Sequence, residues 1–165
     1  MQLEENKNAM LISTMSEIQD REAIANALST VLANSYALYL KTQFYHWNIT
    51  GKNFMSLHTL FEEQYTELAL AIDEIAERIR ALGYFSPGTF KSFMNTSDIK
   101  EDESVPTSST MLQNLIDASE ICIRSCMEAK ELCEDKDDVT EDLMIARINV
   151  LQKNSWMLRS VLVEC

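Results

Sequence analysis

The chain of 165 residues contains only three glycines and two prolines. Tight turns and strand connections depend on these two residue types, so their scarcity argues against an architecture of sheets and turns. No apolar run approaches the roughly 20 residues that a membrane-spanning helix needs. The first residues, MQLEENKNAM, are polar and acidic, whereas a signal peptide would carry positive charge and then an apolar stretch. We therefore expect a cytoplasmic protein without a membrane partner.

Positive charge is also scarce. The chain has 14 lysines and arginines but 26 aspartates and glutamates, so its formal net charge is −12. Such a surface repels nucleic acid and anionic membranes and attracts cations. A chain of this length forms one domain that buries about 70% of its unfolded surface without disulfides or a structural metal. The abundance of Leu, Ala, Glu, Met and Ile favours helices.

Cysteine occurs four times and histidine twice. The cysteines are Cys122, Cys126, Cys133 and Cys165. None forms a CxxC pair and no histidine lies near them, so the spacing does not favour a zinc site. We expect small apolar fillers in a reducing compartment; thiols that consume oxidants are the alternative.

Helical periodicity begins after a tail, residues 1–16, which shows no clear pattern and is expected to be mobile. Ser16 and Gln19 resemble a capping box for a helix over about 17–47. The apolar residues of that helix recur at helical spacing. They include Ile24, Leu28, Val31, Leu32, Leu38, Tyr39 and Phe44.

A second helix is predicted from Asn53, as N-cap, to residue 82, with Gly83 just after its end. Its apolar set includes Leu57, Leu60, Phe61, Leu68, Ile72, Ile75, Ala76 and Ile79. Ser86-Pro87 is expected to start a short helix, because it supplies a cap and a preset φ. Phe90 and Phe93 would form the inward side of that helix.

A polar loop over 95–106 is predicted to lead to a third long helix over about 108–133, and a charged turn then leads to the last helix. Asp138, with Glu141, is expected to cap this last helix, which extends to about residue 163. Two long helices, a crossover that holds a short one, and two more long helices predict an all-α four-helix bundle over 17–165.

One stretch, residues 46–83, holds both histidines and three acids at helical spacing. The acids are Glu62, Asp73 and Glu77. On one ideal helix, His58 and these acids fall at roughly 0°, 40°, 60° and 100°, a single stripe, but Glu62 and Asp73 lie about 16 Å apart along the axis. One helix thus offers two half-sites that cannot hold the same ion. A second antiparallel copy, across a twofold axis near Glu67–Leu68, would bring the two half-sites together.

Imidazole nitrogen and carboxylate oxygen suit divalent first-row metals, and two histidines with one carboxylate suit Fe(II) that must meet an oxidant. His46, His58 and Glu62 could supply that set from one chain. Asp73 and Glu77 from a second copy would add oxygen ligands and negative charge, which favours the ferric product. The alternative is a solvated charged face that binds no metal, and spacing alone leaves both open.

Three aromatic side chains have expected roles near this stretch or in the core. Trp47, beside His46, fits core packing; near an oxidative site it could instead give up electrons to stray oxidising equivalents, as could Tyr65. Trp156 is expected in the core. Asp138 and Asp142 belong to an acidic cluster at the start of the last helix, which fits ordinary helix-start chemistry or the guidance of cations.

These residues resemble the Dps family of miniferritins, the DNA-binding proteins from starved cells. The resemblance covers residues 17–163 and rests on a His-Trp-Asn segment that precedes an acidic helix. The matching residues are His46, Trp47, Asn48, Gly51, Phe54, Leu57, His58, Glu62, Asp73, Ala76, Glu77 and Arg78, with 156–159 late in the chain.

The resemblance implies a ferritin-like four-helix bundle with a short helix in the crossover, assembled as a hollow dodecamer. It implies ferroxidase centres of one or two irons at twofold interfaces. Each would take His46, His58 and Glu62 from one subunit, and Asp73 and Glu77 from its partner. The implied reaction is oxidation of Fe(II), preferably by hydrogen peroxide rather than oxygen, and storage of ferric mineral, which protects against oxidative stress.

The resemblance also places Asp138 and Asp142 in threefold pores through which iron enters. Two features depart from the family. Its members more often have Asp at the position of Glu62, whose extra methylene alters its reach. DNA-binding members often use Lys- and Arg-rich tails, which this chain lacks, so we expect no DNA binding. The alternative function is a nucleoid-associated DNA-condensing or purely structural relative without significant ferroxidase activity.

Overall fold

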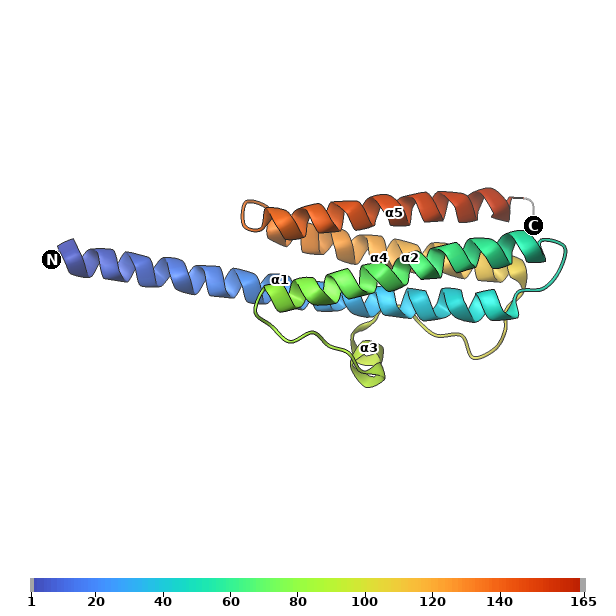
Figure 1. The fold of residues 1–165 in the computed structure, drawn as a ribbon, viewed down its shortest axis with the longest axis horizontal. Helices are drawn as coiled ribbons and strands as arrows, with labels where there is room; N and C mark the ends of the chain where they lie inside the picture. The colour runs from blue at the N-terminus through green and yellow to red at the C-terminus, as the bar shows by residue number, and fades with distance from the viewer. Residues whose placement is uncertain (1, 164–165) are drawn as a thin grey trace.

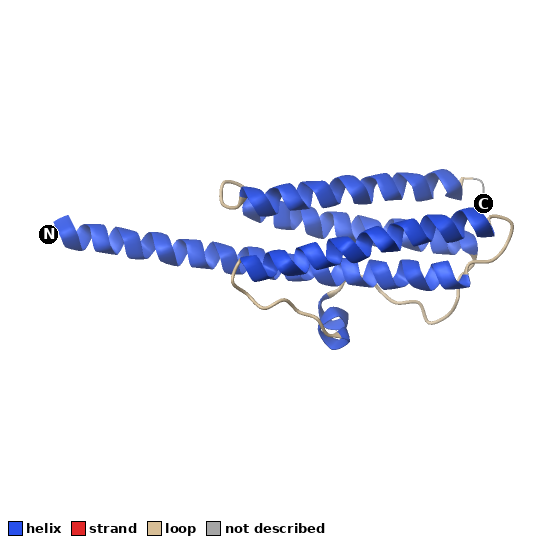
Figure 2. Ribbon diagram, viewed as in Figure 1, coloured by secondary structure: helices blue, strands red, loops and turns tan. Residues whose placement is uncertain are grey.

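The computed structural model describes the backbone of residues 2–163 and the side chains of residues 17–163. It contains the helices α1 (Gln2–Asn48), α2 (Phe54–Ala81), α3 (Phe90–Thr96), α4 (Ser108–Cys133) and α5 (Asp138–Leu162). No strand occurs in the described backbone (Figure 2). The all-α prediction is therefore confirmed.

The four long helices form one bundle, with the short helix α3 outside it (Figure 1). Helices α1 and α2 run antiparallel, as do α4 and α5. The crossover from α2 to α4 returns along the length of the bundle, so α2 and α4 run in the same direction. One long crossover of this kind is the ferritin-like variant of the four-helix bundle.

Helix α1 begins much earlier than predicted, at Gln2 rather than near residue 17. The first residues lack an apolar stripe but also lack Gly and Pro, and Glu, Lys, Met and Leu among them are good helix formers. Nothing local therefore ends the helix, and Ser16 and Gln19 lie within it rather than at its start. The first turns project beyond the end of the bundle (Figure 1). The mobility of residues 1–16 remains a prediction.

The end of helix α2 follows the predicted pattern. Gly83 adopts φ +100°, and its N–H donates to the carbonyl of Arg80 at 3.0 Å. The N–H of Tyr84 donates to the carbonyl of Ile79 at 3.3 Å. Together these two bonds make a Schellman motif, which requires a left-handed residue that glycine adopts without strain.

Two further predicted helix starts are wrong in position. The short helix begins at Phe90 rather than at Ser86-Pro87, because Thr89 and Ser92 form a reciprocal capping box. Helix α5 is capped by Asp137 rather than Asp138, since the Asp137 side chain accepts a hydrogen bond from the Thr140 N–H. Helix α4 runs from Ser108 to Cys133, as predicted.

The bundle interior is filled by the predicted apolar stripes of α1 and α2, together with apolar residues of α4 and α5. Fully buried large side chains include Leu28, Leu32, Leu57, Phe61, Leu68, Ile75, Ile79, Met111, Leu112 and Leu115. Two predictions of burial are wrong here, in addition to that for Trp47 described below. Trp156 is 63% exposed, and Phe90 is 68% exposed, whereas its neighbour Phe93 is buried. Helical spacing alone does not exclude an aromatic residue from the exposed side of a helix. Phe90, at the first residue of α3, meets the core-side ring of Tyr36 only edge-on, at 6.2 Å between centroids.

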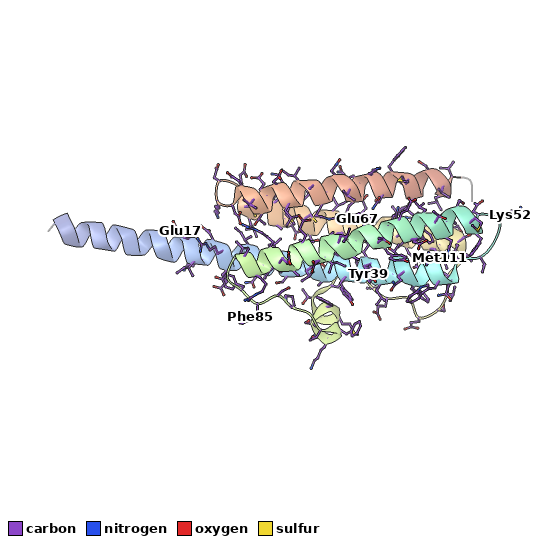
Figure 3. The ribbon with its side chains drawn as sticks, viewed as in Figure 1. Glu17, Tyr39, Lys52, Glu67, Phe85 and Met111 are labelled. Carbon is purple, nitrogen blue, oxygen red and sulfur yellow. The ribbon has the colours of Figure 1, made fainter. Side chains whose placement is uncertain are left out.

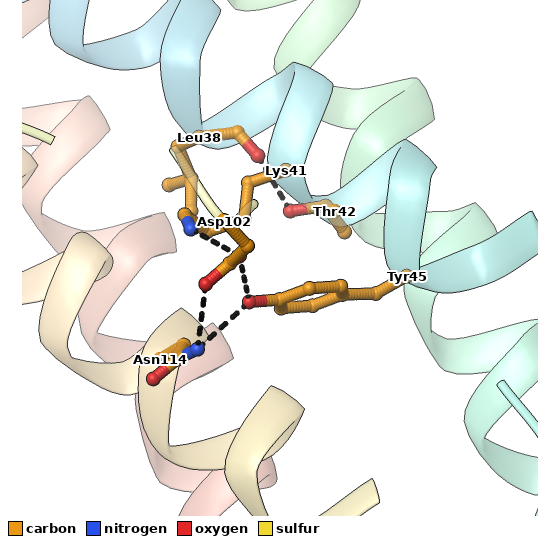
Figure 4. Close-up of polar contacts among 6 residues, drawn as sticks. All are labelled: Leu38, Lys41, Thr42, Tyr45, Asp102 and Asn114. Atoms are coloured by element: carbon orange, nitrogen blue, oxygen red, sulfur yellow. Dashed lines mark hydrogen bonds and ion pairs between the residues drawn. The ribbon is translucent and has the colours of Figure 1, made fainter. Parts of the chain in front are cut away.

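The crossover is attached to the bundle by a polar network (Figure 4). Lys41 of α1 pairs with Asp102 at 2.6 Å, and the Tyr45 hydroxyl donates a short hydrogen bond to the same carboxylate. Asn114 of α4 donates to Asp102 at 3.2 Å and to the Tyr45 hydroxyl at 2.9 Å. Burial and then the bond to Asp102 raise the pKa of the Tyr45 phenol. This network fixes the crossover beside the end of α1 that carries His46.

Candidate metal site

The two histidines lie face to face where α1 ends and α2 begins. The ring centroids of His46 and His58 are 3.7 Å apart, with 19° between the ring planes. Nδ1 of His46 lies 2.8 Å from the backbone carbonyl oxygen of His58, and Nδ1 of His58 lies 2.9 Å from the carbonyl oxygen of His46. The two residues therefore hold each other in place through their own backbones.

These reciprocal bonds set the tautomer of both rings. A carbonyl oxygen can only accept, so each Nδ1 must carry the proton and donate it. In a neutral imidazole the other nitrogen, Nε2, then keeps its lone pair. Metal-bound histidines show the same arrangement, in which one N–H donates to an acceptor and orients the other nitrogen toward the ion. His46 and His58 thus present two oriented nitrogen ligands.

Aromatic rings enclose the histidine pair on both sides. Phe54 stacks against His58 with centroids 5.0 Å apart, and Tyr65 meets His46 edge-on at 5.2 Å. His46 is only 7% exposed. Burial and then the negative charge of Glu62 raise the pKa of the Tyr65 phenol. His46 is therefore shielded from water, whereas His58 is only half-buried, and the Glu62 carboxylate lies close enough to act on Tyr65.

The three candidate carboxylates, Glu62, Asp73 and Glu77, lie on the exposed face of α2. Among the residues with described side chains, no three of His, Cys, Asp and Glu converge closely enough to hold a metal. The structure thus brings His46 and His58 together but gathers none of the three acids into a ligand set with them. An exposed glutamate one turn beyond His58 can change rotamer at little cost. Asp73 and Glu77 lie several turns away along the same rigid helix.

Trp47 is 63% exposed, so the interpretation of this residue as part of the core is wrong for the single chain. Its side chain borders a hollow formed with Ala37, Leu40 and Phe44 of α1 and with the crossover segment 99–102. Trp47 therefore lies at the surface next to the buried His46, and electron donation remains a prediction for it.

The start of α5 combines an anchored cap with free acidic groups. Arg78 donates two hydrogen bonds of 2.8 Å to the Asp137 carboxylate and one of 2.7 Å to the Thr140 hydroxyl. Burial alone would raise the pKa of Asp137, but the bonds from Thr140 and Arg78 outweigh it and lower that pKa. Asp138 and Asp142 are both exposed on the first turns of the helix. An anchored cap with exposed acids beyond it is consistent with either predicted role of the cluster.

Three cysteines are free and buried on α4: Cys122, Cys126 and Cys133. Burial raises the pKa of Cys126 to about 12 and that of Cys133 to about 11, and raises that of Cys122 as well. A thiol must ionise to act as nucleophile or ligand, so these side chains are packing residues, as predicted. Cys165 lies outside the described residues.

Sequence reasoning missed two groups near the histidines. The buried network of Lys41, Tyr45, Asp102 and Asn114 was not foreseen, although a lysine and a tyrosine on the inward side of a helix require polar partners. The second group comprises Tyr36 and Tyr39: the ring of Tyr39 contacts that of Tyr65, and the ring of Tyr36 contacts that of Tyr39. Their i, i+3 spacing was visible in the sequence, but their contact with α2 was not.

Comparison with known proteins agrees with this geometry. The ferritin-like domain family matches residues 25–165. DNA protection during starvation protein 2 of Bacillus anthracis is 34% identical over 140 residues, which cover 84% of this chain and 96% of that protein. The Dps protein of Vibrio cholerae O1 superposes with a TM-score of 0.84 at 37% identity, covering 88% and 92% of the two chains. The chain belongs to the Dps family of miniferritins.

Other Dps proteins show the same agreement. Dps from Staphylococcus aureus superposes with a TM-score of 0.82 at 32% identity, covering 86% of this chain and 95% of that one. The Vibrio cholerae protein is described as a member of a broad superfamily of ferritin-like diiron-carboxylate proteins. Family membership therefore supports iron binding, iron storage and protection as the general function. No helix among the described residues is long and apolar enough to cross a membrane.

Proposed function

We propose that this miniferritin is a ferroxidase that oxidises Fe(II) at a site shared between two subunits. The observation that carries the proposal is the pair of reciprocal bonds between His46 and His58, which orients two Nε2 lone pairs. Nitrogen ligands beside carboxylates suit Fe(II) that must also meet an oxidant. Iron is both the substrate and the stored cargo.

The second half of the site comes from another copy of the chain. Within one chain Asp73 and Glu77 lie too far along α2 to reach an ion bound at His58. The exposed face of α2 between the two half-sites carries Leu70, which is 73% exposed. A twofold axis near Glu67–Leu68 would cover this apolar side chain and place the partner's acids beside the histidines.

Each residue has a defined task in this proposal. His46 and His58 bind Fe(II) without reorienting, because their backbone acceptors already fix both rings. Glu62 supplies an oxygen ligand, and Asp73 and Glu77 from the second copy add the negative charge that stabilises Fe(III) over Fe(II). Hydrogen peroxide, taken as the preferred oxidant over oxygen, accepts one electron from each of two Fe(II) and two protons, and yields two waters and two Fe(III).

Membership of the Dps family supports a proposal for the wider assembly. Twofold dimers would build a hollow dodecamer in the cytoplasm that stores the ferric mineral, with one or two irons per centre. Asp138 and Asp142, exposed at the start of α5, would line the pores that admit iron. Consumption of both Fe(II) and peroxide would protect the cell from hydroxyl radicals.

Anaerobic addition of Fe(II) and then peroxide tests the activity. Ferric absorbance should develop much faster with protein than without it, and replacement of both His46 and His58 by Ala should remove this advantage while the assembled mass stays unchanged. Equal rates with and without the wild-type protein would refute the enzyme assignment.

Two pairs of acids on α2 offer a matched comparison. Asp73→Asn with Glu77→Gln should slow iron oxidation strongly, because both changes remove ligand charge. Glu63→Gln with Glu74→Gln removes two exposed acids of the same helix that lie outside the proposed site, and it should leave the rate close to that of the wild type. A similar loss in both double variants would point to bulk charge rather than to a site.

A further inference from the structure

A continuous series of aromatic rings leads away from the histidine pair. Tyr65 of α2 meets His46 at 5.2 Å between centroids. Tyr39 of α1 meets Tyr65 at 6.1 Å, and Tyr36 meets Tyr39 at 5.8 Å. All three distances lie within the range of direct aromatic contact, about 4.5–7 Å. We name Tyr65, Tyr39 and Tyr36 the tyrosine series.

The series follows the seam between α1 and α2, and Tyr39 lies about midway along the bundle (Figure 3). Its far end, Tyr36, stacks on Phe93 of α3 at 4.6 Å. Tyr36 and Asp73 border the same surface hollow, together with Ala69, Ile72 and Phe90. One end of the series therefore touches the first half-site of the chain, and the other end lies beside its second half-site.

This placement has a consequence in the dimer. The second half-site of a chain completes the iron centre whose histidines belong to the other subunit. The series within one chain therefore begins at one centre and ends beside the other. Two such series, related by the twofold axis, would join both centres of the dimer.

We infer that the tyrosine series transfers electrons between the two iron centres of a dimer, so that one peroxide can be reduced by irons bound at different centres; this inference rests on the proposed function. Phenols suit the task because they lose an electron and a proton to form neutral radicals. Tyr39 already takes part in a polar contact, since its hydroxyl accepts a hydrogen bond of 3.1 Å from Gln43.

The electrons and protons balance in two steps. In the first, Fe(II) at one centre and a tyrosine each give one electron to peroxide, the tyrosine releases its phenolic proton, and one further proton is taken up. The products are Fe(III), a neutral tyrosyl radical and two waters. In the second, Fe(II) at the other centre reduces the radical, which takes up a proton and becomes tyrosine again. The sum is two Fe(II), one peroxide and two protons giving two Fe(III) and two waters.

A tyrosine outside the series provides a control. Tyr84 lies beyond the end of α2, where its hydroxyl donates to the carbonyl of Ile18 at 3.3 Å. Tyr84→Phe removes one phenol outside the series. Tyr39→Phe interrupts the series at its centre, and the retained ring preserves the packing against Tyr36 and Tyr65.

The experiment loads the assembled protein anaerobically with one Fe(II) per centre, adds one peroxide per dimer, and follows the reaction by freeze-quench paramagnetic resonance and Mössbauer spectroscopy. In the wild type and in Tyr84→Phe, both irons of a dimer should become ferric and any tyrosyl signal should decay as they do. In Tyr39→Phe, one iron of each dimer should remain ferrous while a tyrosyl signal persists. That signal should disappear when Tyr65→Phe is added.

Equal ferric yields in Tyr39→Phe and the wild type, without a persistent radical, would overturn the inference while leaving the ferroxidase proposal intact. A radical that survives in the variant lacking both Tyr39 and Tyr65 would also overturn it, and would point to Trp47 as the donor. Absence of ferric product in the wild type, even with excess peroxide, would refute the inference and the proposed function together.

Discussion

At the scale of single residues, the site depends on where two imidazoles place their protons. Each ring of the pair donates through Nδ1 to the backbone carbonyl of the other residue. These bonds, made where α1 ends and α2 begins, leave Nε2 as the ligand nitrogen before any metal binds. Asparagine could donate to the same carbonyl, but it would offer no nitrogen lone pair to iron. The pair thus combines a structural link between α1 and α2 with the capacity to bind metal.

The buried thiols give a prediction at the same scale. Burial raises the pKa of Cys133 to about 11, so at pH 8 only about one thiol in a thousand is ionised. Iodoacetamide should therefore leave Cys122, Cys126 and Cys133 unmodified in the native protein at pH 8, and peptide mass spectrometry would show this. In urea the three should react readily. Rapid native labelling of any of them would contradict their burial.

At the scale of elements, the cap of α5 links the first turn of one helix to the last turn of another. Asp137 has a folded-state pKa below its ordinary value, so its carboxylate stabilises the fold above about pH 4. That contribution is lost as the pH falls through the folded-state pKa. Asp137→Asn keeps an N-cap of similar quality but removes the negative charge that pairs with Arg78.

We therefore expect Asp137→Asn to lower the free energy of unfolding by about 1–2 kcal/mol at pH 7. The difference from the wild type should shrink as the pH falls below about 4, and it should vanish only below the lowered folded-state pKa, where the wild-type carboxyl is also neutral. Urea unfolding at several pH values measures this. Asp135→Asn, at an exposed neighbour with φ 59°, is the control and should change stability little. A pH-independent difference would mean that the charge is unimportant.

The polar network of the crossover gives a second prediction for an element. Tyr45→Phe removes a buried hydroxyl that bonds to Asp102 and Asn114, and leaves their polar groups short of a partner. The free energy of unfolding should therefore fall by about 1–3 kcal/mol. Tyr84→Phe alters a partly exposed hydroxyl and should cost less than about 0.5 kcal/mol. If urea unfolding shows the same loss of unfolding free energy in both variants, the network contributes little to stability.

The long helices, most of their buried stripes and the left-handed Gly83 could be predicted, because periodicity and capping chemistry are local properties of the sequence. The start of α3 differs from the prediction by a few residues and that of α5 by one, because Thr89 and Asp137 are as good capping residues as Ser86 and Asp138. The exposure of Trp156 could not be foreseen from spacing alone. The stacking of His46 on His58 and the pairing of Lys41 with Asp102 depend on contacts between elements, which spacing along one helix does not reveal.

At the scale of the whole molecule, charge sets the limits on partners. The formal net charge of −12 opposes association with DNA, which requires clustered positive charge to release counterions. We expect no retardation of plasmid DNA in a gel at moderate salt and sub-micromolar protein. A basic Dps protein with a lysine-rich tail is the positive control. Retardation by this chain would contradict the expectation.

The central claim is that each iron centre takes residues from two subunits, and mixed assemblies test it most directly. One chain type carries His46→Ala and His58→Ala; the other carries Asp73→Asn and Glu77→Gln. Each should be inactive alone. Unfolded together and reassembled at equal amounts, they should regain about a quarter of the wild-type rate of ferric formation, because about a quarter of the centres receive intact halves from both chains. A mixture as inactive as its components, despite verified mixed assembly, would contradict the shared site.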